Sequence, residues 1–143
     1  SAADLVSAFN RMAAERGLHA ISQPLVERMI ADGAARLYSV WRGDELQTML
    51  LAYIAGDKAI FLQGASAVEK DNDGAGVLLQ WGVMRALKAA GLRWYDMGGL
   101  PSLDSANGIY RFKKGFGGEL VELGAEYGRS GALANLARKL TGR

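Results

Sequence analysis

The sequence predicts a single α/β domain in which a mixed, mostly antiparallel sheet is flanked by helices. The 143 residues are enough to bury one hydrophobic core, and half of them are hydrophobic. Only two residues are proline and 22% are charged, so we expect a folded chain rather than a disordered one. The apolar spacing changes between helical and strand periods in the order α-α-β-β-β-α-β-α-β-α, over residues 1–143.

The N-terminal part of the chain predicts two helices. Apolar residues recur at helical spacing over residues 4–16, and Gly17 is suited to close this helix. Ser22 is a suitable N-cap for a second helix with its own apolar stripe, and Gly33 follows that stripe. We therefore expect two amphipathic helices before the first strand.

Three strands follow, over residues 34–42, 46–55 and 59–66. Each segment carries β-branched, aromatic or aliphatic residues at strand spacing, and the segments are separated by the short turns "GDE" and "GDK". Turns of this length connect antiparallel neighbours, so the three segments predict an antiparallel meander.

The second half of the chain predicts a long helix over residues 71–91, closed by Gly91. One face of this helix would carry Leu79, Val83, Leu87 and Ala90, and another would carry Gln80, Arg85 and Lys88. A short strand over residues 93–99 comes next, followed by a short helix that Asn107 would cap and Gly115 would end. We expect a last strand over residues 119–128 and a terminal helix over residues 132–140.

Composition excludes several kinds of chemistry. The chain has one histidine, His19, and no cysteine, which excludes a multi-histidine metal centre, a disulfide and a thiol nucleophile. We expect no metal, and a reducing, cytoplasmic location. No apolar run is long enough to span a membrane. A formal net charge of +2 gives little support to a dedicated nucleic-acid binder.

Two further motifs are better explained without catalysis. "GASAV" at 64–68 begins like the nucleophile elbow of a serine hydrolase, but it lacks the closing glycine and a nearby base. Glu119, Glu122 and Glu126 alternate along the predicted last strand, so we interpret them as its solvated face rather than as an acid/base pair.

The segment "DNDGAG" at 71–76 joins a predicted strand to the long helix. Gly74, Ala75 and Gly76 would let backbone N–H groups at the helix start point at a phosphate. The segment resembles the Gln/Arg-x-x-Gly-x-Gly/Ala pattern of acyl-CoA-dependent N-acyltransferases, with Asp71 in place of the Gln or Arg. Asp71 and Asp73 would repel a pyrophosphate and are suited to cap a helix, so an acidic helix cap is the alternative interpretation.

The segment "YRFKKGFGGE" at 110–119 places cations between aromatic rings and glycines. On a helix that begins at Asn107, Phe112 and Phe116 would share one face and anchor it in the core. Lys113 would then be held in place and could stabilise a developing oxyanion, or it could bind a phosphate. The alternative is a solvated basic face, formed by Arg111, Lys113 and Lys114, above two core phenylalanines.

The stretch "AAGLRWYDMGGL…GIYRFKKGFGGELVEL" resembles the FemABX family of peptidoglycan-bridge aminoacyltransferases, whose members are built from GNAT-type acyltransferase domains. The similarity includes a Y-D-x-G-G strand from Tyr95 to Gly99 and the G-x-Y-x-F-K-x-G-F-G-G segment, and it extends loosely over residues 22–128. The resemblance implies an aminoacyl-tRNA donor, a peptidoglycan-precursor amine as acceptor, and a role for Lys113 at the acyl end of the donor. Asp96 matches the family aspartate.

The sequence departs from this family in two respects. Family enzymes usually contain two such domains, whereas this chain has room for one, and the helical arm that family members use near tRNA is not evident in it. The chain could act as a homodimer, be a fragment, or use an acyl-CoA donor. We expect an N-acyltransferase in which Lys113 stabilises the oxyanion, Asp96 accepts a proton and Tyr110 protonates the leaving group. Gly74, Ala75, Gly76, Arg111 and Phe112 are the expected donor-binding residues.

Three alternatives stay open at this point. The first is an acetyl-CoA-dependent N-acetyltransferase of a small molecule. The second is a degenerate, non-catalytic transferase domain that binds a wall precursor or a nucleotide. The third is an RNA-binding domain that uses residues 111–114 together with Arg138, Lys139 and Arg143, and it predicts salt-sensitive binding.

Overall fold

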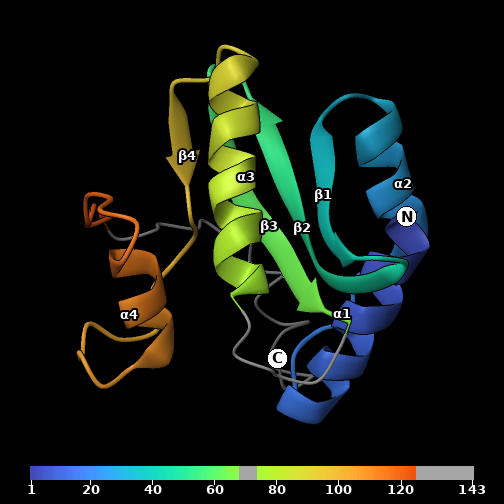
Figure 1. Cartoon of the computed structure of the whole chain (residues 1–143), viewed down its shortest axis with the longest axis horizontal. Helices are drawn as coiled ribbons and strands as arrows, with labels where there is room; N and C mark the ends of the chain where they lie inside the picture. The colour runs from blue at the N-terminus through green and yellow to red at the C-terminus, as the bar shows by residue number, and fades with distance from the viewer. Residues whose placement is uncertain (68–73, 125–143) are drawn as a thin grey trace, which may run out of the picture. The chain divides into compact units, whose positions relative to one another are not determined.

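The computed structural model describes residues 1–67 and 74–124 (Figure 1). The chain divides into two compact units, Ser1–Leu103 and Asp104–Arg143. The helices are α1 (Ala2–Arg16), α2 (Gln23–Ala31), α3 (Ala75–Ala89) and α4 (Gly108–Lys114). The strands are β1 (Ala35–Arg42), β2 (Glu45–Ala55), β3 (Lys58–Ser66) and β4 (Trp94–Asp96). The predicted fold class and the predicted order of elements through α4 are confirmed.

The sheet of the first unit has the strand order β1-β2-β3-β4. β1 pairs with β2 and β2 with β3, both antiparallel, as the two short turns predicted. β4 pairs with β3 in parallel, because α3 returns the chain to the end of the sheet where β3 begins. The sheet is therefore mixed and mostly antiparallel.

Helices cover both faces of this sheet, and β2 contributes to the core on each side. Met49 and Leu51 belong to the apolar cluster with α1 and α2, whereas Leu50 and Ala52 belong to the cluster with α3. Successive strand residues point to opposite faces, so these four neighbours place the two helix layers on opposite sides. All four are at most 1% exposed, which makes β2 the centre of the unit.

The helix boundaries mostly follow the predicted capping residues. Gly17 adopts the left-handed conformation (φ 63°) after α1, and Asn107 caps α4 by accepting the N–H groups of Ile109 and Tyr110. α1 begins two residues earlier than predicted because Ser1 and Asp4 form a capping box. None of the helices in the described part of the chain has the length and apolar character needed to span a bilayer.

The structure corrects several expectations in the second half of the chain. Gln80 is 6% exposed and lies on the buried side of α3, whereas Ala90 is exposed. The N-cap of α3 is Gly74 rather than an aspartate, and it makes no side-chain cap. Residues 119–124 are exposed and form no strand, because they have no strand partner among the described residues. The rest of that predicted strand and the terminal helix over residues 132–140 lie outside the described residues.

Replacing a side chain at the centre of β2 tests the double-sided core. We expect Leu51→Ala to lower the free energy of unfolding by about 2–5 kcal/mol, because the side chain is fully buried and its removal leaves a cavity. Urea denaturation measures this change. Leu25→Ala is the control, since Leu25 is 59% exposed on α2 and its truncation should change stability by less than about 0.5 kcal/mol. Equal losses in the two variants would contradict the described packing.

Candidate functional site

The short strand β4 covers only the start of the outer edge of β3. Only the first three residues of β3 pair with β4, in the register Lys58↔Trp94, Ala59↔Tyr95 and Ile60↔Asp96. β3 continues to Ser66 and remains paired with β2 along this length. Among the described residues, none pairs with the β4-side edge of β3 over residues 62–66, so this edge can bind an extended chain.

A β-bulge lies in β3 just beyond the residues that pair with β4. The register with β2 passes from Leu51↔Gln63 to Ala52↔Phe61, which leaves Leu62 as the extra residue of β3. A bulge bends its strand and increases the local twist. Ile60 is the last residue of β3 that pairs with β4. β3 therefore changes direction just after it, at Leu62.

Asp96 ends β4 and shapes the turn that follows. Its Oδ1 accepts the N–H of Gly98 at 2.7 Å, and Gly98 has a φ of 79°, which only glycine adopts without strain. The carboxylate is exposed. Asp96 therefore fixes the end of β4.

The start of α3 contributes a second part of the site. Gly74 has a φ of 80°, a backbone conformation that favours glycine, so a glycine is needed at this position for the turn into the helix. A pocket of about 200 Å³ lies between this helix start and the end of β1, and its lining includes Arg42, Gly74 and Ala75. A cation from β1 is therefore near the backbone that the sequence predicted to bind phosphate.

The second unit contains the short helix α4. Phe112 and Phe116 share a face as predicted, and their rings meet edge to face with centroids 5.3 Å apart. The expectation that they anchor α4 in the core is wrong for Phe112, which is 36% exposed, and no residue of α4 is buried. A seven-residue helix with three cations in its last turn has too little apolar surface to be buried.

The charged residues of α4 differ in their surroundings. Lys114 lies over the ring of Tyr110, with Nζ 5.4 Å from the ring centroid. Lys113 and Tyr110 are half-buried, and Arg111 is exposed. Lys113, Tyr110, Arg111 and Phe112 thus share the second unit, whereas Asp96 and Gly74–Gly76 belong to the first.

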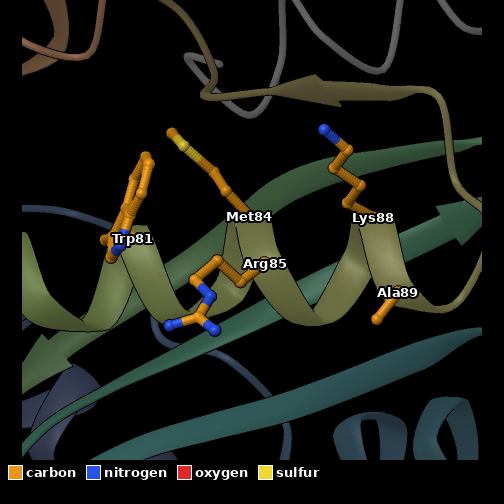
Figure 2. Close-up of a pocket in the computed structure, with 5 residues that line it drawn as sticks. All are labelled: Trp81, Met84, Arg85, Lys88 and Ala89. Carbon is orange, nitrogen blue, oxygen red and sulfur yellow. The ribbon is translucent and has the colours of Figure 1, made fainter.

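The outer face of α3 forms an open pocket of about 550 Å³. Figure 2 shows Trp81, Met84 and Lys88 projecting to one side of the helix and Arg85 to the other. Arg85 and Lys88, which the sequence predicted on one face of the helix with Gln80, are both exposed, unlike Gln80. Every residue known to line this pocket comes from one helix, so we assign no ligand to it.

Sequence reasoning missed a buried polar contact between α3 and β4. The hydroxyl of Tyr95 donates a hydrogen bond to Oε1 of Gln80 at 2.8 Å. Burial raises the pKa of Tyr95, because the phenolate loses hydration there, and the Gln80 hydrogen bond offsets part of this effect. Both residues were visible in the sequence, but only the rotation of α3 against the sheet brings them together.

Comparison with known protein families shows which family the chain belongs to. The model of the acetyltransferase (GNAT) domain matches residues 3–114, which include all the described helices and strands except the first residue of α1. This chain belongs to the GNAT acetyltransferase family. No curated relative matches it by sequence.

Solved structures with the same fold agree with this assignment. An aminoglycoside acetyltransferase from an uncultured soil metagenomic sample, in complex with sisomicin, has a TM-score of 0.68 and 10% identity, covering 90% of this chain and 86% of its own. A probable acetyltransferase has a TM-score of 0.66 and 11% identity, covering 92% and 89%. The ribosomal-protein-S18-alanine N-acetyltransferase of Escherichia coli has a TM-score of 0.52 and 12% identity, covering 69% and 61%. At these identities the likeness shows the GNAT fold.

Because the pKa of Tyr95 is raised, the stability of the GNAT domain should decrease at alkaline pH. Above the ordinary value of 10.0, the unfolded chain loses the phenolic proton while the folded chain keeps it, so stability falls as pH rises. We expect Tyr95→Phe to show a smaller fall between pH 8 and pH 10.5, measured from urea midpoints. Tyr53→Phe, which removes an exposed hydroxyl, should retain the wild-type fall. Identical pH dependence in Tyr95→Phe and wild type would contradict the burial of this hydroxyl.

Proposed function

We propose that this GNAT domain is an N-acyltransferase that moves an acyl group from an acyl-CoA thioester to an amine. The observation that carries the proposal is the edge of β3 over residues 62–66, which has no strand partner among the described residues, in a domain of the acetyltransferase family. Such an edge provides a backbone-lined binding surface for the donor. Acyl-CoA is a cytoplasmic donor, so the proposal places the reaction in that compartment.

The donor arm suits the edge of β3. The pantetheine part of acyl-CoA is a narrow, extended chain with two amide groups. Such a chain can hydrogen-bond to the backbone along residues 62–66 in the way an added strand does. The bend at the Leu62 bulge would direct the thioester end toward the turn after β4.

The start of α3 supports binding of the donor's phosphates. Gly74, Ala75 and Gly76 present no bulky side chains there, and the positive end of the helix dipole favours an anion. Asp71 stands where the motif of acyl-CoA-dependent enzymes has a Gln or Arg. Arg42 lines the pocket beside Gly74 and supplies positive charge from a different strand. We propose that Arg42 takes the place of the missing motif cation.

The chemistry follows from the thioester. The amine nitrogen attacks the carbonyl carbon, the carbon–sulfur bond breaks, and the sulfur leaves as the CoA thiol. We propose that Lys113 stabilises the tetrahedral oxyanion, that Asp96 accepts the amine's proton and that Tyr110 protonates the sulfur. Arg111 and Phe112, which flank Lys113 in sequence, would contact the donor. Alignment of the two substrates supplies the rest of the rate acceleration.

Removing the ammonium at position 113 tests the oxyanion role. We expect Lys113→Met to lower the rate of transfer by about 10²–10³-fold, because one donor to the oxyanion is lost. The measurement is release of CoA thiol from acetyl-CoA in the presence of a panel of primary amines. Lys114→Met is the matched control, since it removes the neighbouring cation that lies over Tyr110. Full activity in Lys113→Met would remove the proposed role.

Two substitutions at position 96 separate its structural role from its proposed role as a base. Asp96→Asn keeps an Oδ1 that can accept the Gly98 N–H, so stability should be retained while transfer falls at least about 10²-fold. Asp96→Ala should in addition lower the free energy of unfolding by about 0.5–1.5 kcal/mol. Urea denaturation and the thiol-release assay measure the two effects. A wild-type rate of transfer in Asp96→Asn would exclude the role of Asp96 as a base and leave only its structural role in the turn after β4.

Aminoacyl transfer to a peptidoglycan-precursor amine is the second candidate function. The Y-D-x-G-G strand and the F-K-x-G-F-G-G segment, which resemble FemABX enzymes, support it. Incubation with charged tRNA and a lipid-free peptidoglycan precursor separates the two donors, because only an aminoacyltransferase would discharge the tRNA. A domain that binds acetyl-CoA in calorimetric titration and transfers nothing to any acceptor would instead be a binding module.

A further inference from the structure

Gln80 is a polar residue in an apolar setting. It is 6% exposed, and its helix neighbours Leu79, Val83 and Leu87 form the buried cluster between α3 and the sheet. A glutamine buried among aliphatic side chains must satisfy both ends of its amide, because an unmade hydrogen bond in such a place is costly.

The two ends of this amide differ in their surroundings. Oε1 accepts the hydrogen bond from the Tyr95 hydroxyl at 2.8 Å. Nε2, which carries two N–H donors, makes no hydrogen bond to any described residue and reaches solvent, since none of the fully buried side-chain nitrogens and oxygens in the described residues lacks a partner. Since Tyr95 occupies the oxygen, the donor end of the amide is left facing away from that contact.

Gln80 lies in the first half of α3, at the end of the sheet where β3 continues beyond β4. The helix begins beside the ends of β1 and β2 that meet there, as the pocket shared by Arg42 and Gly74 shows. The same end of the sheet contains the end of β3, because Thr48 pairs with Ser66. Gln80 follows the helix start by five residues, or about 7.5 Å at 1.5 Å per residue. Tyr95, its partner, is on β4 and pairs with Ala59 of β3.

We propose that Gln80 is a donor-binding residue whose Nε2 donates a hydrogen bond to a carbonyl oxygen of the acyl donor's pantetheine arm. The inference rests on the proposed function, since it needs an amide-bearing chain along the edge of β3. A side-chain amide is well suited to bind the pantetheine arm. Its N–H groups can donate to an amide carbonyl oxygen of the arm that makes no hydrogen bond to the strand edge. Binding of the arm would satisfy the open end of Gln80.

Tyr95 acts through Gln80 as a positioning residue. Its hydroxyl donates to Oε1, and this contact holds the amide with Oε1 toward β4 and with Nε2 turned away from Tyr95. Without the hydroxyl the amide could rotate by half a turn and present its oxygen, which cannot bind a carbonyl. The contact therefore links the position of β4 to recognition of the donor.

The test measures acetyl-CoA affinity by calorimetric titration and thermal unfolding on the same samples. Gln80→Met keeps the volume and removes the amide, so we expect binding about tenfold weaker with a melting temperature at or above that of wild type. Gln80→Glu keeps an oxygen for Tyr95 and lacks the N–H donors, so it should weaken binding similarly at pH 8. Tyr95→Phe should give a smaller loss of affinity. A residue that serves stability alone would not give weaker binding with an undiminished melting temperature.

Asn10→Leu is the matched control. This amide lies on α1, on the opposite face of the sheet, and both its ends bond to the backbone of Ile21, at 3.1 and 2.8 Å. We expect it to lower the melting temperature and leave acetyl-CoA affinity unchanged. Wild-type affinity in both Gln80→Met and Gln80→Glu would overturn the inference while leaving the transferase proposal intact. Absence of acetyl-CoA binding by the wild-type protein would overturn both.

Discussion

The pairing of β4 with β3 over three residues is the constraint on which the site depends. All three residues of β4 pair with the start of β3 and the strand ends there, so the edge of β3 over residues 62–66 has no strand partner among the described residues. The Leu62 bulge turns β3 at this point, and the Asp96–Gly98 contact shapes the chain as it leaves β4. Extending the pairing by a few residues would cover this edge.

The core of the first unit makes this arrangement possible. β2 is buried on both faces and is paired along both edges, so it can hold β3 in place where β4 does not. Helices on the two faces then fix the sheet against bending. This edge of β3 is therefore part of a rigid scaffold, where a ligand can be bound without disturbing the packed centre.

The donor-binding residues that we propose are distant from one another in the sequence. Asp71 departs from the motif of acyl-CoA-dependent enzymes, but Arg42 from β1 lines the pocket at the start of α3. Gln80 of α3 and Tyr95 of β4 likewise form one polar contact inside an apolar layer. In each case α3 contributes one member of the pair and a strand contributes the other: β1 brings Arg42 beside the helix start, and β4 brings Tyr95 to Gln80. A motif of consecutive residues includes only the member on the helix.

The sequence by itself determined the elements of this protein. Apolar spacing, short Gly-Asp turns and capping residues such as Asn107 are local features, so they predicted the meander, the order of elements through α4 and the mixed sheet. Tertiary structure decided the burial of Gln80, the exposure of Phe112 and the absence of a strand over residues 119–124. These depend on how a helix is rotated against the sheet and on whether a strand finds a partner. Local spacing encodes neither, because both are set by contacts between residues far apart in the chain.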